Sequence, residues 1–125
     1  MGGDDRLYYE EAYEIVNCAY AVFNALGFGL PERVYENALC VEFRHRGHEY
    51  VQQERHAVMY RDEMVGEYFT DLIWRKIILV ENKSRECIVD AHINQTLNYL
   101  RITKLRLGLV INFGPKGVEF RRVVL

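Results

Sequence analysis

Several signals that mark particular classes of protein are scarce in this sequence or missing from it. The 125 residues include two prolines, three cysteines and one serine, Ser84. The single serine argues against a serine hydrolase. Cys18, Cys40 and Cys87 form no Cys-x-x-Cys pair, which argues against a zinc knuckle and against a disulfide framework. No apolar run approaches the roughly 18 residues of a membrane span. We therefore expect a protein with reduced thiols and no membrane segment.

The charges are also balanced rather than dominated by one sign. There are 18 acidic and 16 basic residues, for a net charge of −2, which excludes a histone-like basic protein and a disordered acidic tail. The first six residues lack the apolar core of a signal peptide, so we expect a cytoplasmic protein. Neither a G-x-x-x-x-G-K-[ST] phosphate loop nor an H-E-x-x-H zinc motif occurs.

Half of the residues are hydrophobic, which is enough for a core, and we expect one domain covering residues 1–125. Helical periodicity predicts helices over residues 5–26, 31–46 and 89–101. Apolar runs and alternation predict strands over 49–61, 67–74, 77–83, 105–113 and 118–125. Turns at 61–63 and 75–76 make the first three strands an antiparallel meander. The order α-α-β-β-β-α-β-β predicts a mixed sheet with helices on either side.

Three charged residues stand within or at the end of apolar strands. Asp71 interrupts strand 67–74, and Glu81 and Lys83 end the most apolar strand of the chain. Side chains two apart on a strand share a face, so Glu81 and Lys83 point the same way. A three-residue loop between the strands places Asp71 opposite Glu81, whereas a two-residue loop pairs Asp71 with Val80 and separates the carboxylates. The sequence leaves both registers open.

Two converging carboxylates suit Mg²⁺ or Mn²⁺, which prefer oxygen ligands. Such an ion lowers the pKa of a bound water and neutralises charge on a phosphate. Lys83 would then orient the water and stabilise charge in the transition state. These residues predict metal-assisted hydrolysis of a phosphodiester. A plainer interpretation of the same pattern is that Glu81 and Lys83 form a solvated ion pair at the end of their strand.

Two further carboxylates share one face of the second helix. Glu32 and Glu36 are four residues apart and follow the pattern Gly29-x-x-Glu32-x-x-Tyr35. The helix dipole favours Glu32 in the first turn. It gives no reason for a second negative charge at Glu36, which indicates a cation or another positive group nearby.

A polar stripe runs along the third helix and contains His92, Gln95 and Tyr99, at spacings of three and four residues. Gln95 would reach the substrate backbone or a bound water. The alternative is that the stripe is simply the solvated face of the helix.

Taken together, these motifs resemble the GxxExxY family, which is grouped with the PD-(D/E)XK nuclease-like superfamily. The resemblance extends from about residue 10 to the end of the chain. The matching segments are residues 29–39, 71–73, 80–83, 95–100, 108–114 and 121–123. The residue before Asp71 is Thr70 rather than the proline of the superfamily pattern, a departure that touches no ligand.

The resemblance implies a mixed α/β (α+β) fold. Its core is a restriction-endonuclease-like sandwich in the order α-β-β-β-α-β, to which this chain adds an N-terminal helix and a C-terminal edge strand. It also implies catalytic roles for Asp71, Glu81, Lys83 and Gln95. Asp71 and Glu81 would hold the metal ion with Glu36, although Glu32 is the other candidate for the first-helix acid. Gly29, Glu32 and Tyr35 would support the first-helix motif.

The implied substrate is nucleic acid, with DNA preferred to RNA. We expect contacts from Arg33, Arg75, Lys76 and Arg85. Most affinity of proteins for nucleic acid comes from basic residues, so a net charge of −2 predicts weak or partner-assisted binding.

A second hypothesis is a catalytically silent module of the same fold that acts in protein assembly or nucleic-acid binding. The chain has nine tyrosines, a residue enriched at interfaces, and Tyr8, Tyr9 and Tyr13 crowd the first predicted helix. This helix would form a homodimer contact or a contact within a larger complex, or would simply pack within the molecule.

Overall fold

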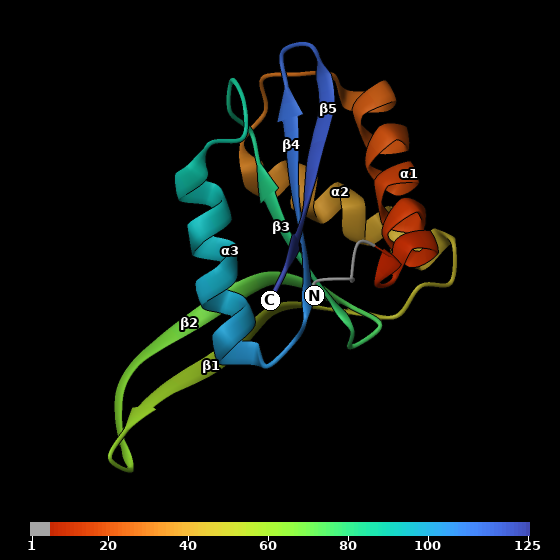
Figure 1. Cartoon of the computed structure of the whole chain (residues 1–125). Helices are drawn as coiled ribbons and strands as arrows, with labels where there is room; N and C mark the ends of the chain where they lie inside the picture. Colours follow the sequence, from red (N-terminus) through yellow and green to blue (C-terminus); the bar gives the residue numbers. More distant parts are fainter. Residues whose placement is uncertain (1–5) are drawn as a thin grey trace.

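The computed structural model describes residues 6–125, which form one five-stranded sheet flanked by helices (Figure 1). The helices are α1 (Tyr9–Leu26), α2 (Glu32–His45) and α3 (Asp90–Thr103). The strands are β1 (Tyr50–Tyr60), β2 (Glu63–Trp74), β3 (Ile78–Lys83), β4 (Leu107–Gly114) and β5 (Gly117–Val124). The order α2-β1-β2-β3-α3-β4 is the predicted core, with α1 as the added helix and β5 as the added edge strand.

The strands lie in the sheet in chain order, so β1 and β5 are the two edges. All neighbours are antiparallel except β3 and β4, which are parallel. Parallel neighbours need a crossover connection, and α3 supplies it. β3 and β4 are buried almost throughout because helices cover both of their faces, which explains why the sequence shows them as near-continuous apolar runs.

Apolar cores lie on both faces of the sheet. The larger core packs α1 and α2 against alternate side chains of β2, β3 and β4. The smaller core packs α3 against the other face, around Leu79, Leu100 and Val110. Gly108 of β4 allows α3 to approach closely, because a Cβ atom built there would lie 2.6 Å from Cγ2 of Thr96. None of the helices in residues 6–125 is long and apolar enough to cross a membrane.

The predicted C-terminal ends of the first two helices are confirmed to within one residue, whereas α3 ends at Thr103, two residues beyond its predicted end. α1 stops at Leu26, and Gly27, with φ 73°, donates its N–H to the carbonyl of Phe23. α2 stops shortly before Gly47, which has φ 76°. The predicted start of the first helix at residue 5 lies outside the described residues, and the described helix begins at Tyr9.

β1 and β2 extend beyond the other strands as a two-stranded ribbon (Figure 1). The predicted turn is confirmed: Arg61 and Asp62, with φ 49° and 65°, connect the two strands. β2 begins at Glu63 rather than at residue 67 as predicted. Its first residues are mostly exposed, so main-chain pairing with β1, and not burial of one face, makes them a strand.

Candidate active site

Asp71 and Glu81 lie on neighbouring strands, at the point where β2 and β3 part. The antiparallel register pairs Leu72 with Val80, which leaves Asp71 and Glu81 as the next opposed pair. The connection is therefore the three-residue loop 75–77. Of the two registers that the sequence allowed, the one that brings the carboxylates together is confirmed.

Main-chain groups hold the two carboxylates across the strands. The N–H of Asp71 donates to Oε2 of Glu81 at 3.4 Å, and the N–H of Asn82 donates to Oδ2 of Asp71 at 3.0 Å. Glu81 is only 3% exposed. Within residues 6–125 neither carboxylate forms an ion pair with a basic side chain. The protein thus holds one buried and one half-buried carboxylate, and within residues 6–125 neither has a cationic side chain as a partner.

The pKa values of both groups reflect this burial. Desolvation and, to a lesser extent, the negative charge of Glu36 raise the pKa of Asp71 to about 6, although the Asn82 N–H opposes the rise. Desolvation and then the charge of Asp71 hold the pKa of Glu81 well above its ordinary range. A pair of desolvated like charges is relieved by a bound cation. The donor set of two carboxylates therefore fits a divalent metal ion.

Lys83 is positioned by α3. It lies two residues after Glu81 on the same face of β3, and its Nζ donates to Oε1 of Gln95 at 3.0 Å. Nε2 of Gln95 in turn donates to the hydroxyl of Tyr99 at 3.3 Å. His92 instead stabilises the start of α3, because its Nδ1 accepts the N–H of Val89. Gln95 and Tyr99 of the predicted polar stripe thus face the site.

Glu36 is buried, at 3% exposure, and meets two glutamines of β1. Its carboxylate accepts from Nε2 of Gln52 at 2.7 Å and from Nε2 of Gln53 at 3.0 Å. Adjacent strand residues normally point to opposite faces. The backbone of Gln53 is left-handed, with φ 54°, and Gln53 is not paired with Asp71 across the sheet. The strand is therefore kinked at this residue, and at this kink the amides of Gln52 and Gln53 converge on Glu36. Sequence reasoning missed both glutamines, because no turn residue marks the kink.

The expected positive group near Glu36 is Arg33, whose Nε lies 3.6 Å from its Oε1. Within residues 6–125 no three His, Cys, Asp or Glu side chains gather into a metal-binding group. The charge of Glu36 nevertheless acts on both Asp71 and Glu81, and its role as a third metal ligand stays a prediction. Glu32, the other candidate acid, pairs with Nε of Arg85 at 3.4 Å.

Gly29 and Tyr35 shape the loop that precedes α2. Gly29 has φ 112°, a conformation that other residues rarely adopt. The Tyr35 hydroxyl donates to the carbonyl of Gly27 and accepts the N–H of Leu30, and its ring stacks on Phe113 of β4 with 4.5 Å between the ring centroids. These two residues of the first-helix motif therefore fix the loop and the helix against the sheet.

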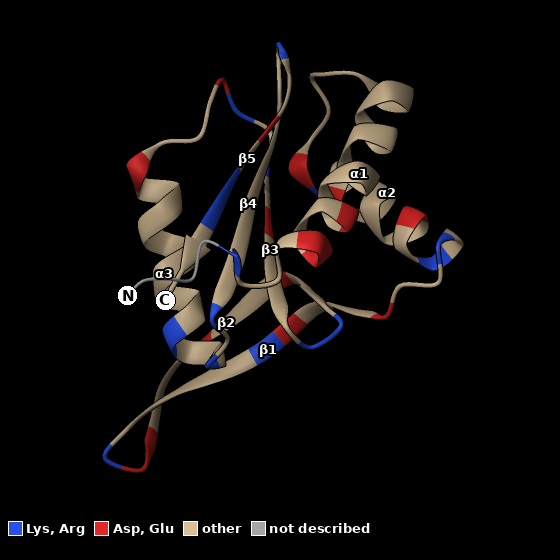
Figure 2. Cartoon of the chain, turned by 45° about the vertical axis from the view of Figure 1, so that its right-hand side comes forward, with Lys and Arg blue, Asp and Glu red and all other residues tan. Residues whose placement is uncertain are grey.

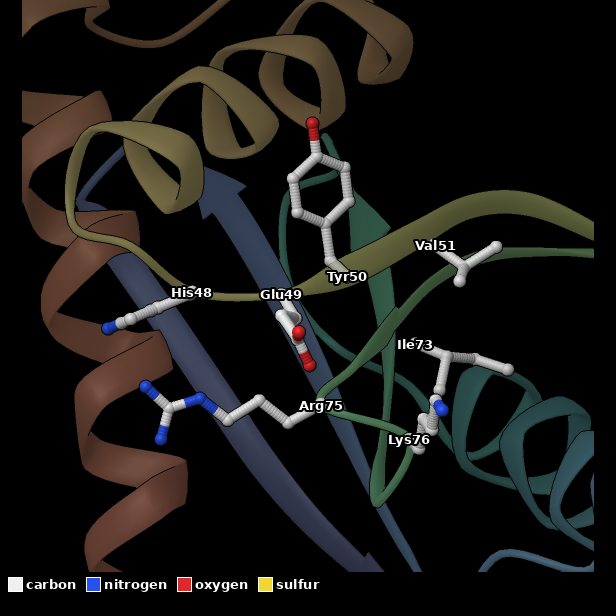
Figure 3. Close-up of a pocket in the computed structure, with 7 residues that line it drawn as sticks. All are labelled: His48, Glu49, Tyr50, Val51, Ile73, Arg75 and Lys76. Carbon is white, nitrogen blue, oxygen red and sulfur yellow. The ribbon is translucent and has the colours of Figure 1, made fainter.

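The four basic residues predicted to contact nucleic acid do not form one patch. Arg33 and Arg85 face carboxylates of α2, as described above. Arg75 and Lys76 lie beyond the opposite end of β3 and line a pocket of about 500 Å³ with His48 and Glu49 (Figure 3). Lys and Arg residues are spread over several elements and turns (Figure 2). Contact of these four residues with nucleic acid stays a prediction.

The mixed sheet, with its acidic pair where two central strands part, defines a restriction-endonuclease-like fold. A model of the PD-(D/E)XK nuclease superfamily matches residues 9–123, and the chain belongs to this superfamily. Nucleases of this superfamily generally use divalent metal ions. The narrower assignment to the GxxExxY family stays a prediction.

One similar solved structure is the crystal structure of SSO0001. It has 18% sequence identity and a TM-score of 0.58 over 94% of this chain, and the chain spans 59% of the length of that protein. At this identity the likeness supports the fold alone. No curated protein matches the sequence.

Proposed function

We propose that this chain is a divalent-metal-dependent nuclease that hydrolyses phosphodiester bonds of nucleic acid. The observation that carries the proposal is the pair of opposed carboxylates, half-buried Asp71 and buried Glu81, with Lys83 on the same face of β3 as Glu81. A fold needs no such pair for its stability, because two desolvated like charges destabilise it. Strongly perturbed carboxylates that converge in this way are typical of functional sites.

Asp71 and Glu81 are the proposed ligands of Mg²⁺ or Mn²⁺. When bound, the ion lowers the pKa of a water molecule and neutralises charge on the phosphate. Mg²⁺ keeps several waters and takes few protein ligands, so two carboxylates suffice for it. Lys83 would orient the attacking water and stabilise the negative charge that develops on the phosphate. Gln95 would act as a positioning residue, because its amide oxygen holds the Lys83 ammonium group.

Nucleic acid is the proposed substrate, with DNA preferred to RNA. The net charge of −2 and the scatter of basic residues favour weak binding, or binding assisted by a partner. We further propose that residues 1–125 act as one nuclease-like domain, because the apolar cores on both faces share one sheet.

The test is cleavage of labelled single- and double-stranded DNA and RNA with Mg²⁺ or Mn²⁺. Asp71→Asn keeps the size and an acceptor for the Asn82 N–H but removes the charge, and it should abolish cleavage. Asp62→Asn is the matched control, because Asp62 lies at the tip of the ribbon in a conformation that asparagine tolerates. EDTA should stop cleavage by the wild type and by the control. Equal cleavage by Asp71→Asn and wild type would refute the proposal.

A second candidate function, protein assembly, is favoured by the ribbon. Four apolar side chains at its tip are more than half exposed: Met59, Tyr60, Met64 and Val65. Exposed apolar clusters mark interaction surfaces. Light scattering should show a mass above 14.8 kDa that returns to the monomer value in Met64→Lys. A monomeric wild type would remove the self-assembly version.

A further inference from the structure

Tyr68 is an exposed aromatic residue on β2, three residues before Asp71. Its side chain is 44% exposed, although it is held on one side by a ring of α3. The ring centroids of Tyr68 and Tyr99 are 5.4 Å apart, with an angle of 66° between the planes, which is an edge-to-face arrangement. Tyr68 is thus a supported ring with surface left open to solvent.

The supporting ring leads directly to the candidate active site. The Tyr99 hydroxyl accepts from Gln95, and Gln95 accepts from Lys83, so three contacts connect the Tyr68 ring with the Lys83 ammonium group. Three residues of strand separate Tyr68 from Asp71, or about 10 Å. Side chains three apart on a strand normally point to opposite faces, so it is the contact with Tyr99, and not the strand spacing, that places the Tyr68 ring on the α3 side of the sheet, where Lys83 meets Gln95.

We propose that Tyr68, supported by Tyr99, is a stacking surface for a nucleobase next to the scissile phosphate, so that the substrate is unpaired there. This inference rests on the proposed nuclease function. A base within a duplex is already stacked and paired, whereas an unpaired base can lie against an aromatic side chain.

The distribution of charge favours the same substrate. Arg33 and Arg85, at the end of the sheet near Lys83, already face Glu36 and Glu32, which leaves less positive charge for phosphates. Stacking on an aromatic ring does not depend on phosphate contacts and tolerates any base. A site with few uncommitted basic groups beside its carboxylates therefore gains affinity from an exposed ring.

The test measures binding rather than cleavage, with a short single-stranded DNA that carries one 2-aminopurine. The Glu81→Gln protein is used so that the DNA stays intact, and stacking is read as quenching of 2-aminopurine fluorescence. In that background Tyr68→Leu should lose the quenching and raise Kd about fivefold or more, and Tyr68→Phe should retain both properties. The same DNA annealed to its complement should show little quenching.

Tyr20→Leu is the matched control, since Tyr20 of α1 is also 44% exposed but belongs to the opposite helical layer. It should bind and quench like its parent. Unchanged Kd and quenching in Tyr68→Leu would overturn the inference, as would absence of binding by the parent. If Asp71→Asn removes metal-dependent cleavage while Tyr68→Leu binds normally, only the stacking surface fails. If the wild type never cleaves but quenching depends on Tyr68, the nuclease proposal fails and the base-binding surface stands.

Discussion

Replacing Asp71 with asparagine should stabilise the metal-free protein at alkaline pH. The pKa of Asp71 rises from an ordinary value of 3.8 to about 6 in the folded protein, chiefly through burial. An acid whose folded pKa is raised reduces stability once it ionises: the cost is absent below about pH 4, grows between pH 4 and 6, and is complete above. Asp71→Asn removes the charge and keeps an acceptor for the Asn82 N–H.

The size of the effect follows from the pKa. Each pH unit by which a pKa rises corresponds to about 1.4 kcal/mol, so the rise to about 6 corresponds to about 3 kcal/mol. Part of this gain is lost where asparagine pairs less well, so we expect an increase of about 1–3 kcal/mol in the free energy of unfolding at pH 8. At pH 4 the increase should nearly vanish.

Urea unfolding in EDTA, followed by the fluorescence of Trp74, measures this difference, because Trp74 is the single tryptophan and is fully buried. Mg²⁺ should stabilise the wild type at pH 8 and leave Asp71→Asn unchanged. The control Asp62→Asn should show neither effect. A loss of stability in Asp71→Asn at pH 8, or an equal gain at pH 4 and pH 8, would show that the ionised Asp71 does not destabilise the metal-free protein.

Three other substitutions test the surroundings of the site by urea unfolding. Gly108→Ala should lower the free energy of unfolding by about 1–3 kcal/mol, because the added Cβ would lie 2.6 Å from Cγ2 of Thr96. Adding Thr96→Ser, which removes this methyl group, should restore part of the loss. An unchanged unfolding midpoint in Gly108→Ala would contradict this packing. His48 accepts the indole N–H of Trp74 at 3.1 Å, and burial lowers its pKa, so its contribution is present above pH 6.5 and lost as pH falls. His48→Leu should therefore cost more at pH 8 than at pH 5, and equal costs would count against this role. Among the described residues, 6–125, none is a hydrogen-bond partner for the side-chain oxygen or nitrogen of buried Asn82, so Asn82→Val should be neutral or stabilising. A loss above about 1 kcal/mol would reveal a polar partner.

The sequence predicts the order of elements because each carries a strong local signal. Gly27 and Gly47 end their helices, and the apolar runs of β3 and β4 match burial on both faces. The register between β2 and β3 could not be predicted from the sequence in the same way. The apolar residue Ile77 fits both the last position of a turn and the first position of a strand. The pairing of Asp71 with Glu81 is therefore known only from the backbone of the loop in the structure.

Other features of the site depend on contacts that leave no local pattern. Position 53 has a left-handed backbone but is a glutamine, not the glycine or asparagine that usually marks such a position. The sequence of β1 therefore gives no sign of the kink or of the two amides that donate to Glu36. The partners of Arg33 and Arg85 likewise depend on how α2 packs against β3. The count of charges, a net −2, does not show which basic side chains face carboxylates within the protein.

The decisive measurement for the proposed nuclease activity is the rate of Mn²⁺-dependent cleavage of labelled single-stranded DNA by Lys83→Met. Lys116→Met, an exposed lysine in the β4–β5 turn at the same end of the sheet, is the matched control. We expect that Lys116→Met cleaves at the wild-type rate, that EDTA abolishes this cleavage, and that Lys83→Met is folded but inactive. Cleavage by Lys83→Met at the wild-type rate would show that Lys83 has no part in the reaction.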